Sequence, residues 1–310
     1  GGEAEVLLTG HTGAVTGLDW NVAGDSLASA SGADGSVRLW KPDEGVCVRV
    51  LEALQDTGVR VLRFHPCNAS ILITAGSDKR MVLYNTSVGV EVASAALGSE
   101  LTAIDVSPSG TMVYTGGADG AVHGVWCELQ PRRRFVPGGA GAALKPRLRA
   151  AARAIPALRE LRTGAESGSA ACTSLAFRAR CEAVKGGAAV VAYFSRAGRV
   201  KLFAAPQPPA ASARLTLALV IALPMRVRDA SLELLPVPSN AGFTDSIVVG
   251  SEDGRLRAHA LNADASLLGR VGRTPRDATP TTALAYDSAL ATLAVGDCDG
   301  NVRLLCVSDF

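Results

Sequence analysis

Three residues near the start of the chain are of the types that form a nucleophilic triad. His11, Ser29 and Asp34 could supply the base, the hydroxyl and the carboxylate with which serine hydrolases work. Ser29 is not framed by the Gly-x-Ser-x-Gly turn that exposes such a nucleophile, and no oxyanion donors can be assigned from the sequence. The chain has only 4 histidines to act as general bases. We therefore expect these residues to be structural and the chain not to be an enzyme.

Two further patterns could hold a metal or a phosphate, and neither is complete. His65 and Cys67 are metal-ligating types, but no second pair of ligands stands at a partner spacing. The run from Gly138 to Gly141 lacks the Lys-Ser or Lys-Thr that follows the glycines of a P-loop. We expect the first pattern to be a turn at a strand end and the second to be a loop, with no metal and no cofactor bound.

One segment carries a strong positive charge in a chain that is otherwise close to neutral. Residues 130–163 contain nine basic residues against the single acid Glu160, whereas the formal charge of the whole chain is +2. The alternatives are a solvated loop, a basic helix interrupted at Pro156, or a site for phosphates, nucleic acid or an acidic protein. Aromatic residues that could stack on bases are absent apart from Phe135, which does not favour nucleic acid. The anion-binding candidates are Arg132, Arg133, Arg134, Lys145, Arg147 and Arg149.

A repeat defines the elements that must position these groups. A strand ending in small residues, an Asp-containing turn and a second strand recur in three strong copies: Ala30 to Trp40, Thr74 to Tyr84 and Thr115 to Trp126. Including weaker copies, the turn position falls at Asp34, Asp78, Asp119, Ala197, Asp253 and Asp299, with gaps of 44, 41, 78, 56 and 46 residues. A period of about 40 to 45 residues is that of a four-stranded propeller blade. The longest gap then contains one blade and the basic segment.

The repeat predicts an all-β fold. We expect a single β-propeller domain over residues 1–310, with six blades of four antiparallel strands and the basic segment 130–163 as an insert within it. Because a string of blades leaves two open sheet edges, Ala4 to Leu8 are predicted to pair as the fourth strand of the last blade. If the N-terminus is truncated, a seventh blade could precede these six. The longest apolar run, Leu215 to Leu223, is too short to cross a bilayer, so no membrane contact is predicted.

The segment from His11 to Trp40 resembles a repeat of the WD-repeat β-propeller family. The resemblance is carried by Gly10-His11, by the turn Asp34-Gly35 and by the strand end Leu39-Trp40. It implies that His11, Ser29, Asp34 and Trp40 form a buried, hydrogen-bonded tetrad in the first blade. It also implies a role in protein assembly, for which propellers of this family typically serve as platforms.

Later copies of the tetrad are predicted to be incomplete. Tyr84 stands where the second blade should have its tryptophan, Trp126 comes one residue late in the third, and Ala197 replaces the aspartate of the fourth. The resemblance is thus strong in the first third of the chain and weak in the last. The partial tetrads are predicted from Thr74, Asp78 and Tyr84 in the second blade and from Thr115, Asp119 and Trp126 in the third.

The sequence favours a noncatalytic scaffold that binds other proteins or peptides through loops at one rim and at the central opening of the ring. An anion or nucleic-acid binder acting through the insert and an enzyme with a site at the propeller centre are the alternatives. The 7 cysteines are scattered without CxxC pairs, which indicates a reducing compartment, so the cytoplasm or the nucleus is expected. The candidate protein contacts are Asp56, Arg60, Ser77, Arg196, Arg228 and Glu252.

Overall fold

The structure is a computed structural model of the 310-residue chain. The contacts group the chain into two compact units, the first formed by residues 1–114 and 123–157 and the second by residues 115–122 and 158–310. The residues that the structure describes are 8–51, 58–127, 153–154, 171–181, 187–194, 198–205, 215–222, 232–239, 242–250, 256–260, 267–271, 281–287, 292–297 and 302–306.

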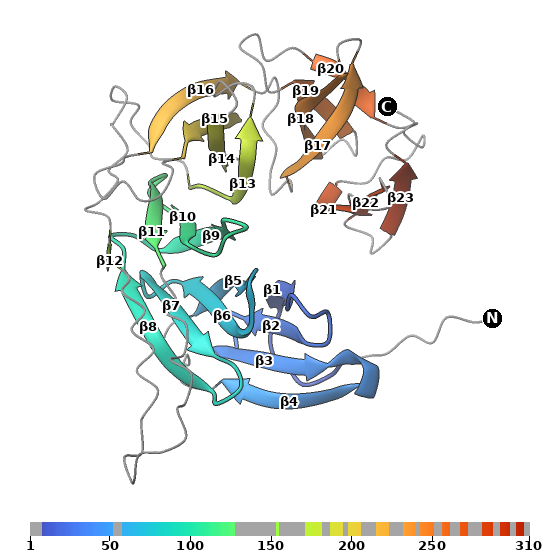
Figure 1. Ribbon diagram of the computed structural model, residues 1–310. Coiled ribbons are helices and arrows are strands. Elements are labelled where there is room, and N and C mark those ends of the chain that lie inside the picture. The colour runs from blue at the N-terminus through green and yellow to red at the C-terminus, as the bar shows by residue number, and fades with distance from the viewer. Residues whose placement is uncertain are drawn as a thin grey trace, which may run out of the picture. The chain divides into compact units, whose positions relative to one another are not determined.

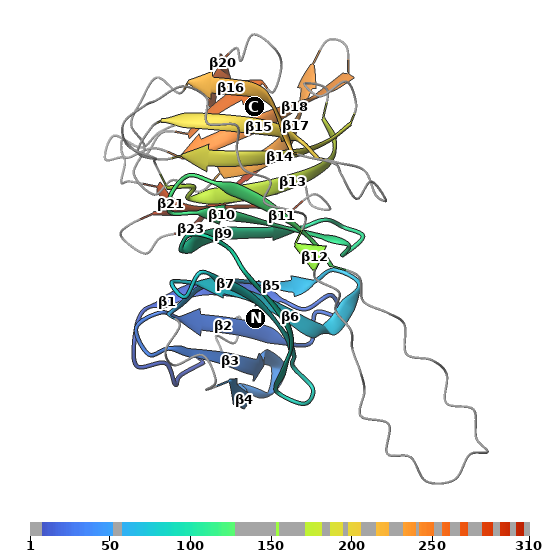
Figure 2. The same cartoon turned by 90° about the vertical axis from the view of Figure 1, so that its left-hand side faces the viewer.

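In the described residues the strands form six sheets, and neighbouring strands follow the order of the chain (Figures 1 and 2). The first two sheets consist of β1 (Val15–Trp20), β2 (Leu27–Ser31), β3 (Ser36–Lys41) and β4 (Val46–Leu51), and of β5 (Val59–His65), β6 (Asn68–Gly76), β7 (Arg80–Asn85) and β8 (Val90–Ala96). The third consists of β9 (Leu101–Val106), β10 (Met112–Gly117), β11 (Val122–Trp126) and β12 (Arg153–Ala154). A single 3-10 turn, η1 (Pro42–Glu44), is the one helical element described.

The remaining three sheets follow the same plan. They consist of β13 (Ser174–Cys181), β14 (Gly187–Phe194), β15 (Arg199–Ala204) and β16 (Thr216–Ala222); of β17 (Leu232–Ser239), β18 (Gly242–Gly250), β19 (Leu256–Ala260) and β20 (Leu267–Val271); and of β21 (Thr281–Asp287), β22 (Thr292–Asp297) and β23 (Val302–Cys306). The prediction of four-stranded antiparallel sheets is confirmed, and the six sheets seen in the described residues are consistent with the predicted six blades. The last sheet has three described strands. Most of the predicted closing strand, Ala4 to Leu8, lies outside the described residues.

Asp-containing turns join the second and third strands of the first three sheets. In each, the aspartate accepts a hydrogen bond from the backbone N–H two residues on: Asp34 from Ser36 at 2.8 Å, Asp78 from Arg80 at 3.1 Å and Asp119 from Ala121 at 3.0 Å. The residue after each aspartate is left-handed, with φ of 67° at Gly35, 64° at Lys79 and 79° at Gly120. The repeat seen in the sequence is therefore a repeated turn geometry.

In the first unit, apolar side chains fill the spaces between neighbouring sheets. Ala28 and Leu39 of the first sheet pack in one buried cluster with Leu62 and Tyr84 of the second. Leu83, which points to the other face of β7, lies in a second cluster with residues of the third sheet. The second sheet is thus buried on both faces. In the second unit, β14 contains four consecutive fully buried residues, which likewise indicates a strand covered on both sides.

Bulges recur at the same place in several sheets. In the outermost strands β4, β8, β16 and β20, one extra residue interrupts the pairing with the third strand; these residues are Val48, Val92, Ala218 and Leu268. A second set of bulges lies near the start of the first strand, where Thr16 in β1, Arg60 in β5 and Thr282 in β21 are the extra residues. Bulges on edge strands hinder pairing with further strands, and bulges in general redirect side chains.

Two residues of the basic segment belong to a sheet. Arg153 and Ala154 form β12, which pairs with Trp126 and Val125 of β11 and completes the third sheet. At these two positions the chain is therefore extended, and the basic helix considered as an alternative is not formed there. The rest of segment 130–163 lies outside the described residues. Within the part of the chain that is described, no helix has the length and apolar character needed to span a membrane.

Replacement of Lys79 by glycine is expected to stabilise the protein. Lys79 occupies the left-handed position that glycine holds in the two equivalent turns, and a side chain there costs energy that glycine avoids. We expect Lys79→Gly to raise the free energy of unfolding by about 0.5 to 1 kcal/mol, measured by chemical denaturation. Lys79→Ala keeps the strain and serves as the control, so equal stability of the two variants would contradict the prediction.

Candidate functional site

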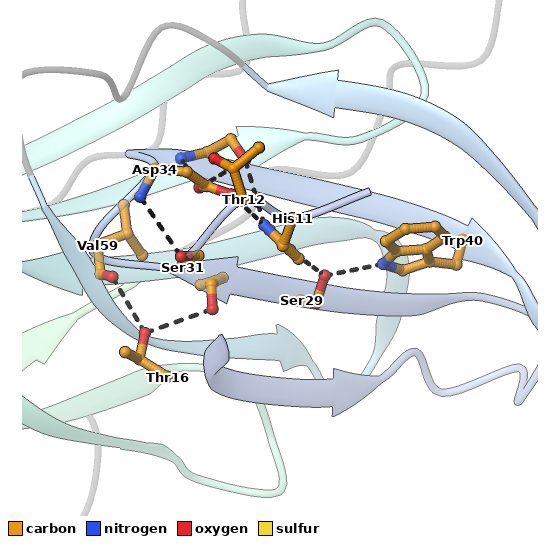
Figure 3. Close-up of polar contacts among 10 residues, drawn as sticks. His11, Thr12, Thr16, Ser29, Ser31, Asp34, Trp40 and Val59 are labelled. Atoms are coloured by element: carbon orange, nitrogen blue, oxygen red, sulfur yellow. Dashed lines mark hydrogen bonds and ion pairs between the residues drawn. The ribbon is translucent and has the colours of Figure 1, made fainter. Parts of the chain in front are cut away.

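The four residues of the predicted tetrad lie together in the first sheet (Figure 3). His11 precedes β1, Ser29 is on β2, Asp34 is in the following turn and Trp40 is near the end of β3. His11 Nδ1 lies 2.7 Å from Asp34 Oδ2, and its Nε2 lies 2.6 Å from Ser29 Oγ. Trp40 Nε1–H donates to the same Ser29 Oγ at 2.8 Å. A continuous chain of hydrogen bonds thus joins the turn to the far end of β3.

One tautomer of the histidine satisfies every member of this network. With the proton on Nδ1, His11 donates to Asp34, its Nε2 accepts from the Ser29 hydroxyl, and Ser29 accepts from the Trp40 indole. The side chains of His11 and Asp34 are only 7% and 9% exposed, and Ser29 and Trp40 are buried. The Ser29 hydroxyl is thus enclosed and engaged on both sides. The geometry holds the sheet together and offers no open nucleophile.

The carboxylate of Asp34 is held in its charged form. Burial alone would raise its pKa, but hydrogen bonds from His11, from the N–H and hydroxyl of Ser36 and from the N–H of Thr12 together lower the pKa well below the usual range. The network therefore stabilises an ionised aspartate in a largely enclosed position.

The second sheet has the same positions without a described histidine. Thr74 and Tyr84 are buried, and Tyr84 pairs with Leu72 as Trp40 pairs with Leu27. Burial, followed by the nearby charge of Glu91, raises the pKa of Tyr84 to about 12. The residues that precede β5, 52–57, lie outside the described part of the chain.

The third sheet departs further from the pattern. Leu97 lies four residues before β9, as His11 lies four before β1, and it packs against an apolar cluster. Thr115 is completely buried, and its hydroxyl has no hydrogen-bond partner among the described residues. Val125, six residues after Asp119, takes the place that Trp40 has after Asp34, and it is buried. Trp126, on the opposite face of the strand, is partly exposed and is not brought to this set.

Two of the candidate protein contacts can be placed. Arg60 is the bulge residue of β5, and its guanidinium lies 3.5 Å from the carboxylate of Glu100, with both side chains nearly half exposed. Ser77 begins the β6–β7 turn and donates its backbone N–H to Gly58 O at 3.3 Å. The remaining contact candidates, Asp56, Arg196, Arg228 and Glu252, lie outside the described residues, as do the anion-binding candidates Arg132, Arg133, Arg134, Lys145, Arg147 and Arg149.

The His65-Pro66-Cys67 segment forms a turn at a strand end. The Nδ1 of His65 accepts from the N–H of Cys67 at 3.2 Å, and its Nε2–H donates to Gly110 O at 3.1 Å. Both ring nitrogens are therefore engaged, and burial lowers the pKa of this histidine. No group of three metal-ligating side chains occurs where the structure describes them.

Sequence reasoning missed Asp19, which joins the first two sheets. Its Oδ2 accepts from the backbone N–H of Phe64 in β5 at 2.6 Å, and Arg63 lies 3.9 Å away. Burial raises the pKa of Asp19, although the hydrogen bond from Phe64 and the charge of Arg63 oppose the rise. Asp105 occupies the corresponding place in β9, so an internal comparison of the first strands was the signal available.

Removal of the buried carboxylate is expected to destabilise the protein. Asp34→Ala leaves the His11 ring, the Ser36 N–H and the Thr12 N–H without an acceptor. We expect a loss of about 2 to 4 kcal/mol in the free energy of unfolding, measured by denaturant titration. Asp78→Ala is the matched control, since it removes the same turn acceptor where no histidine bond is described. A loss no larger than that of the control would show that the histidine link contributes nothing.

The contribution of Asp34 is also expected to depend on pH. Its folded pKa is lowered, whereas the unfolded value is near 3.9. The stabilisation should therefore be complete above about pH 4 and be lost as the pH falls toward the folded pKa. The difference in unfolding free energy between wild type and Asp34→Asn should therefore begin to shrink below about pH 4 and continue to shrink as the pH falls further. A difference that is the same at pH 7 and pH 3 would rule out this linkage.

Comparisons with known proteins point to one kind of repeat and one fold. The family described as "WD domain, G-beta repeat" matches residues 2–41 and 94–123. The chain is 26% identical over 153 residues to the Coronin-like protein crn1 of Schizosaccharomyces pombe, a match covering 46% of this chain and 25% of that protein. It is 26% identical over 114 residues to Protein NEDD1 of Homo sapiens, covering 37% of this chain and 17% of that protein. The chain thus spans no more than about a quarter of these relatives.

A solved structure extends the likeness to nearly the whole chain. The beta-propeller domain of Cps50 (Swd1) from Myceliophteria thermophila superimposes with a TM-score of 0.62 and covers 96% of this chain and 84% of its own, at 17% sequence identity. At this identity the likeness concerns the fold alone. The first matched segment contains the whole His11, Ser29, Asp34 and Trp40 network, and the second contains the Asp119 turn. Together the observations support WD40 repeats in the matched segments and a β-propeller fold for the chain.

Proposed function

We propose that the chain is a noncatalytic scaffold that binds partner proteins or peptides through loops at one rim and at the central opening of its propeller. The observation that carries this proposal is that the side chains that could do chemistry are enclosed within the first sheet, whereas other polar side chains are exposed to a partner. In the set that resembles a catalytic triad, Ser29 is buried, the side chains of His11 and Asp34 are only 7% and 9% exposed, and the three are hydrogen-bonded to one another. Exposed polar side chains such as those of Lys79 and Asp43 lie in the segments that join strands, where a partner can contact them.

The proposed binding surface is the end of the first two sheets that carries the Asp-containing turns. This Asp-turn rim comprises residues 32–35, 58–60, 77–79 and 97–100. Its segments are held together by hydrogen bonds from Ser77 N–H to Gly58 O and from Leu97 N–H to Lys79 O at 2.7 Å. The opposite rim comprises residues 21–26, 42–45 and 86–89. A firmly held rim would lose little conformational freedom when a partner binds.

The proposal also covers the type of repeat protein and the cell compartment. The order and spacing of the repeats, with the sequence Ser251-Glu252-Asp253, resemble those of WD repeat-containing protein thirteen. A reducing intracellular compartment, the cytoplasm or the nucleus, is proposed because the 7 cysteines form no CxxC pair and four of them, Cys47, Cys67, Cys127 and Cys172, are free thiols.

Cross-linking mass spectrometry can test which rim binds. The full chain would be incubated with a reducing cell extract and an amine-reactive cross-linker. Lys79 is exposed on the Asp-turn rim, whereas Lys41 is exposed beside the opposite rim. We expect partner cross-links to form at Lys79 in preference to Lys41. We also expect Arg60→Glu to lower their yield by about fivefold without a change in melting temperature, because a reversed rim charge weakens association.

Two control variants make the result specific. Arg49→Glu introduces the same charge change on β4, beside the opposite rim, and should leave the Lys79 cross-links unchanged. Neutralising Arg132, Arg133 and Arg134 to glutamine tests the alternative of binding through the basic segment. Cross-links that form mainly at Lys41, or that disappear only in the triple variant, would overturn the proposal.

A further inference from the structure

The first strands of three sheets carry a bulge at the same position, and the residue placed there differs in chemistry. In β1 the extra residue is Thr16, whose hydroxyl lies 3.4 Å from Ala30 O and 3.3 Å from Val59 O. In β21 it is Thr282, and in β5 it is Arg60. A bulge takes its residue out of the regular alternation of the strand. At this position β5 therefore presents a guanidinium where the other two strands have a hydroxyl residue.

The backbone beneath Arg60 is tightly enclosed. A Cβ on Gly76 would lie 2.5 Å from Gly58 O, and a Cβ on Gly17 would lie 3.4 Å from Arg60 O. Gly58 itself has a φ of 51°, which favours glycine. Val59 O also accepts the contact from the Thr16 hydroxyl. The segment Gly58 to Arg60 is thus packed between its own sheet and the first sheet, and Arg60 extends from a backbone with little room to move.

The described ion pair of Arg60 is a weak one. Its Nη2 lies 3.5 Å from Glu100 Oε2, longer than the distance of about 2.8 Å expected of a charge-assisted hydrogen bond. The two side chains are 48% and 44% exposed, so water can compete with the contact. Arg80, by comparison, donates to both Glu91 and Ser94, at 3.1 and 2.7 Å. A guanidinium has five N–H donors, and a bidentate carboxylate fits it better than the present contact with Glu100.

We propose that Arg60 is the carboxylate-recognising residue of the Asp-turn rim, and that Glu100 occupies it in the free chain as an internal competitor. The partner group is the side chain of a glutamate or aspartate in an extended acidic segment of another protein. The inference rests on the proposed scaffold function and deepens it by naming the chemistry of the partner. Binding would exchange the long Glu100 contact for a bidentate one, and Glu100 would turn to solvent.

A labelled peptide of four Glu-Ala repeats is a suitable probe, with four Gln-Ala repeats as the neutral comparison. Binding to the full chain would be followed by fluorescence anisotropy in about 20 mM salt, where screening is weak. We expect Glu100→Gln to tighten binding of the acidic peptide about two- to fivefold, because the competitor is removed. Arg60→Gln should weaken binding at least about fivefold relative to wild type, and any binding through the basic segment 130–163 is common to all forms and cancels in this comparison. Arg60→Lys should restore only part of the lost affinity, since an ammonium cannot form the bidentate pair.

The Arg80 and Glu91 pair supplies a matched control. Its side chains are 42% and 40% exposed, so Glu91→Gln makes the same change in net charge at a similar exposure, but on β8. We expect Glu91→Gln, a change within β8 and outside the rim residues, to leave the affinity within about twofold of wild type. Equal effects of Glu100→Gln and Glu91→Gln would overturn the proposal, as would unchanged binding by Arg60→Gln or no binding by any form.

The outcome is distinguishable from failure of the scaffold proposal. If partner cross-links at Lys79 persist while the Arg60 and Glu100 variants bind the acidic peptide as wild type does, the scaffold stands and Arg60 is not its carboxylate anchor. If the peptide results are as expected but partner cross-links form elsewhere, the recognition chemistry stands and the rim assignment is wrong.

Discussion

The first sheet depends on satisfying one largely enclosed carboxylate. Asp34 has to remain hydrogen-bonded, because an ionised group without donors in such a position would be costly. Its donors come from the turn itself and from His11, a residue that precedes the whole sheet. Through Ser29 the same network extends to Trp40 at the end of β3. A single local requirement thus holds the entering chain and the two middle strands in register.

The features that the sequence predicts well are those that depend on few neighbouring residues. An aspartate followed by a left-handed residue forms its turn almost independently of the rest of the chain, and it recurs at Asp34, Asp78 and Asp119. The strand order follows from these turns. The full network requires four side chains that meet across the sheet, so it is lost when one is replaced. In the third sheet Leu97 stands at the histidine position, and the buried Thr115 hydroxyl has no described partner.

What could not be predicted depends on contacts between strands. The bulges at Thr16 and Arg60 are defined by register with the partner strand, which single residues do not reveal. The position of Trp126 is different, because its one-residue delay is visible in the sequence and the alternation of a strand places a side chain shifted by one residue on the other face. Asp19 contacts the backbone of a neighbouring sheet, so its role cannot be read from its own strand alone. The pairing of Arg153 and Ala154 with β11 joins segments separated by a long basic stretch with no strand pattern.

The bulges also indicate how repeated sheets can differ in function without losing stability. A residue in a regular strand has cross-strand neighbours on its face, so its identity is constrained by packing. A bulge residue has no such partner, while the pairing on either side of it is preserved. Thr16 and Arg60 occupy the same structural position although one is a small alcohol and the other a cation. The buried network can therefore remain fixed while the bulge residue changes its chemistry from one sheet to the next.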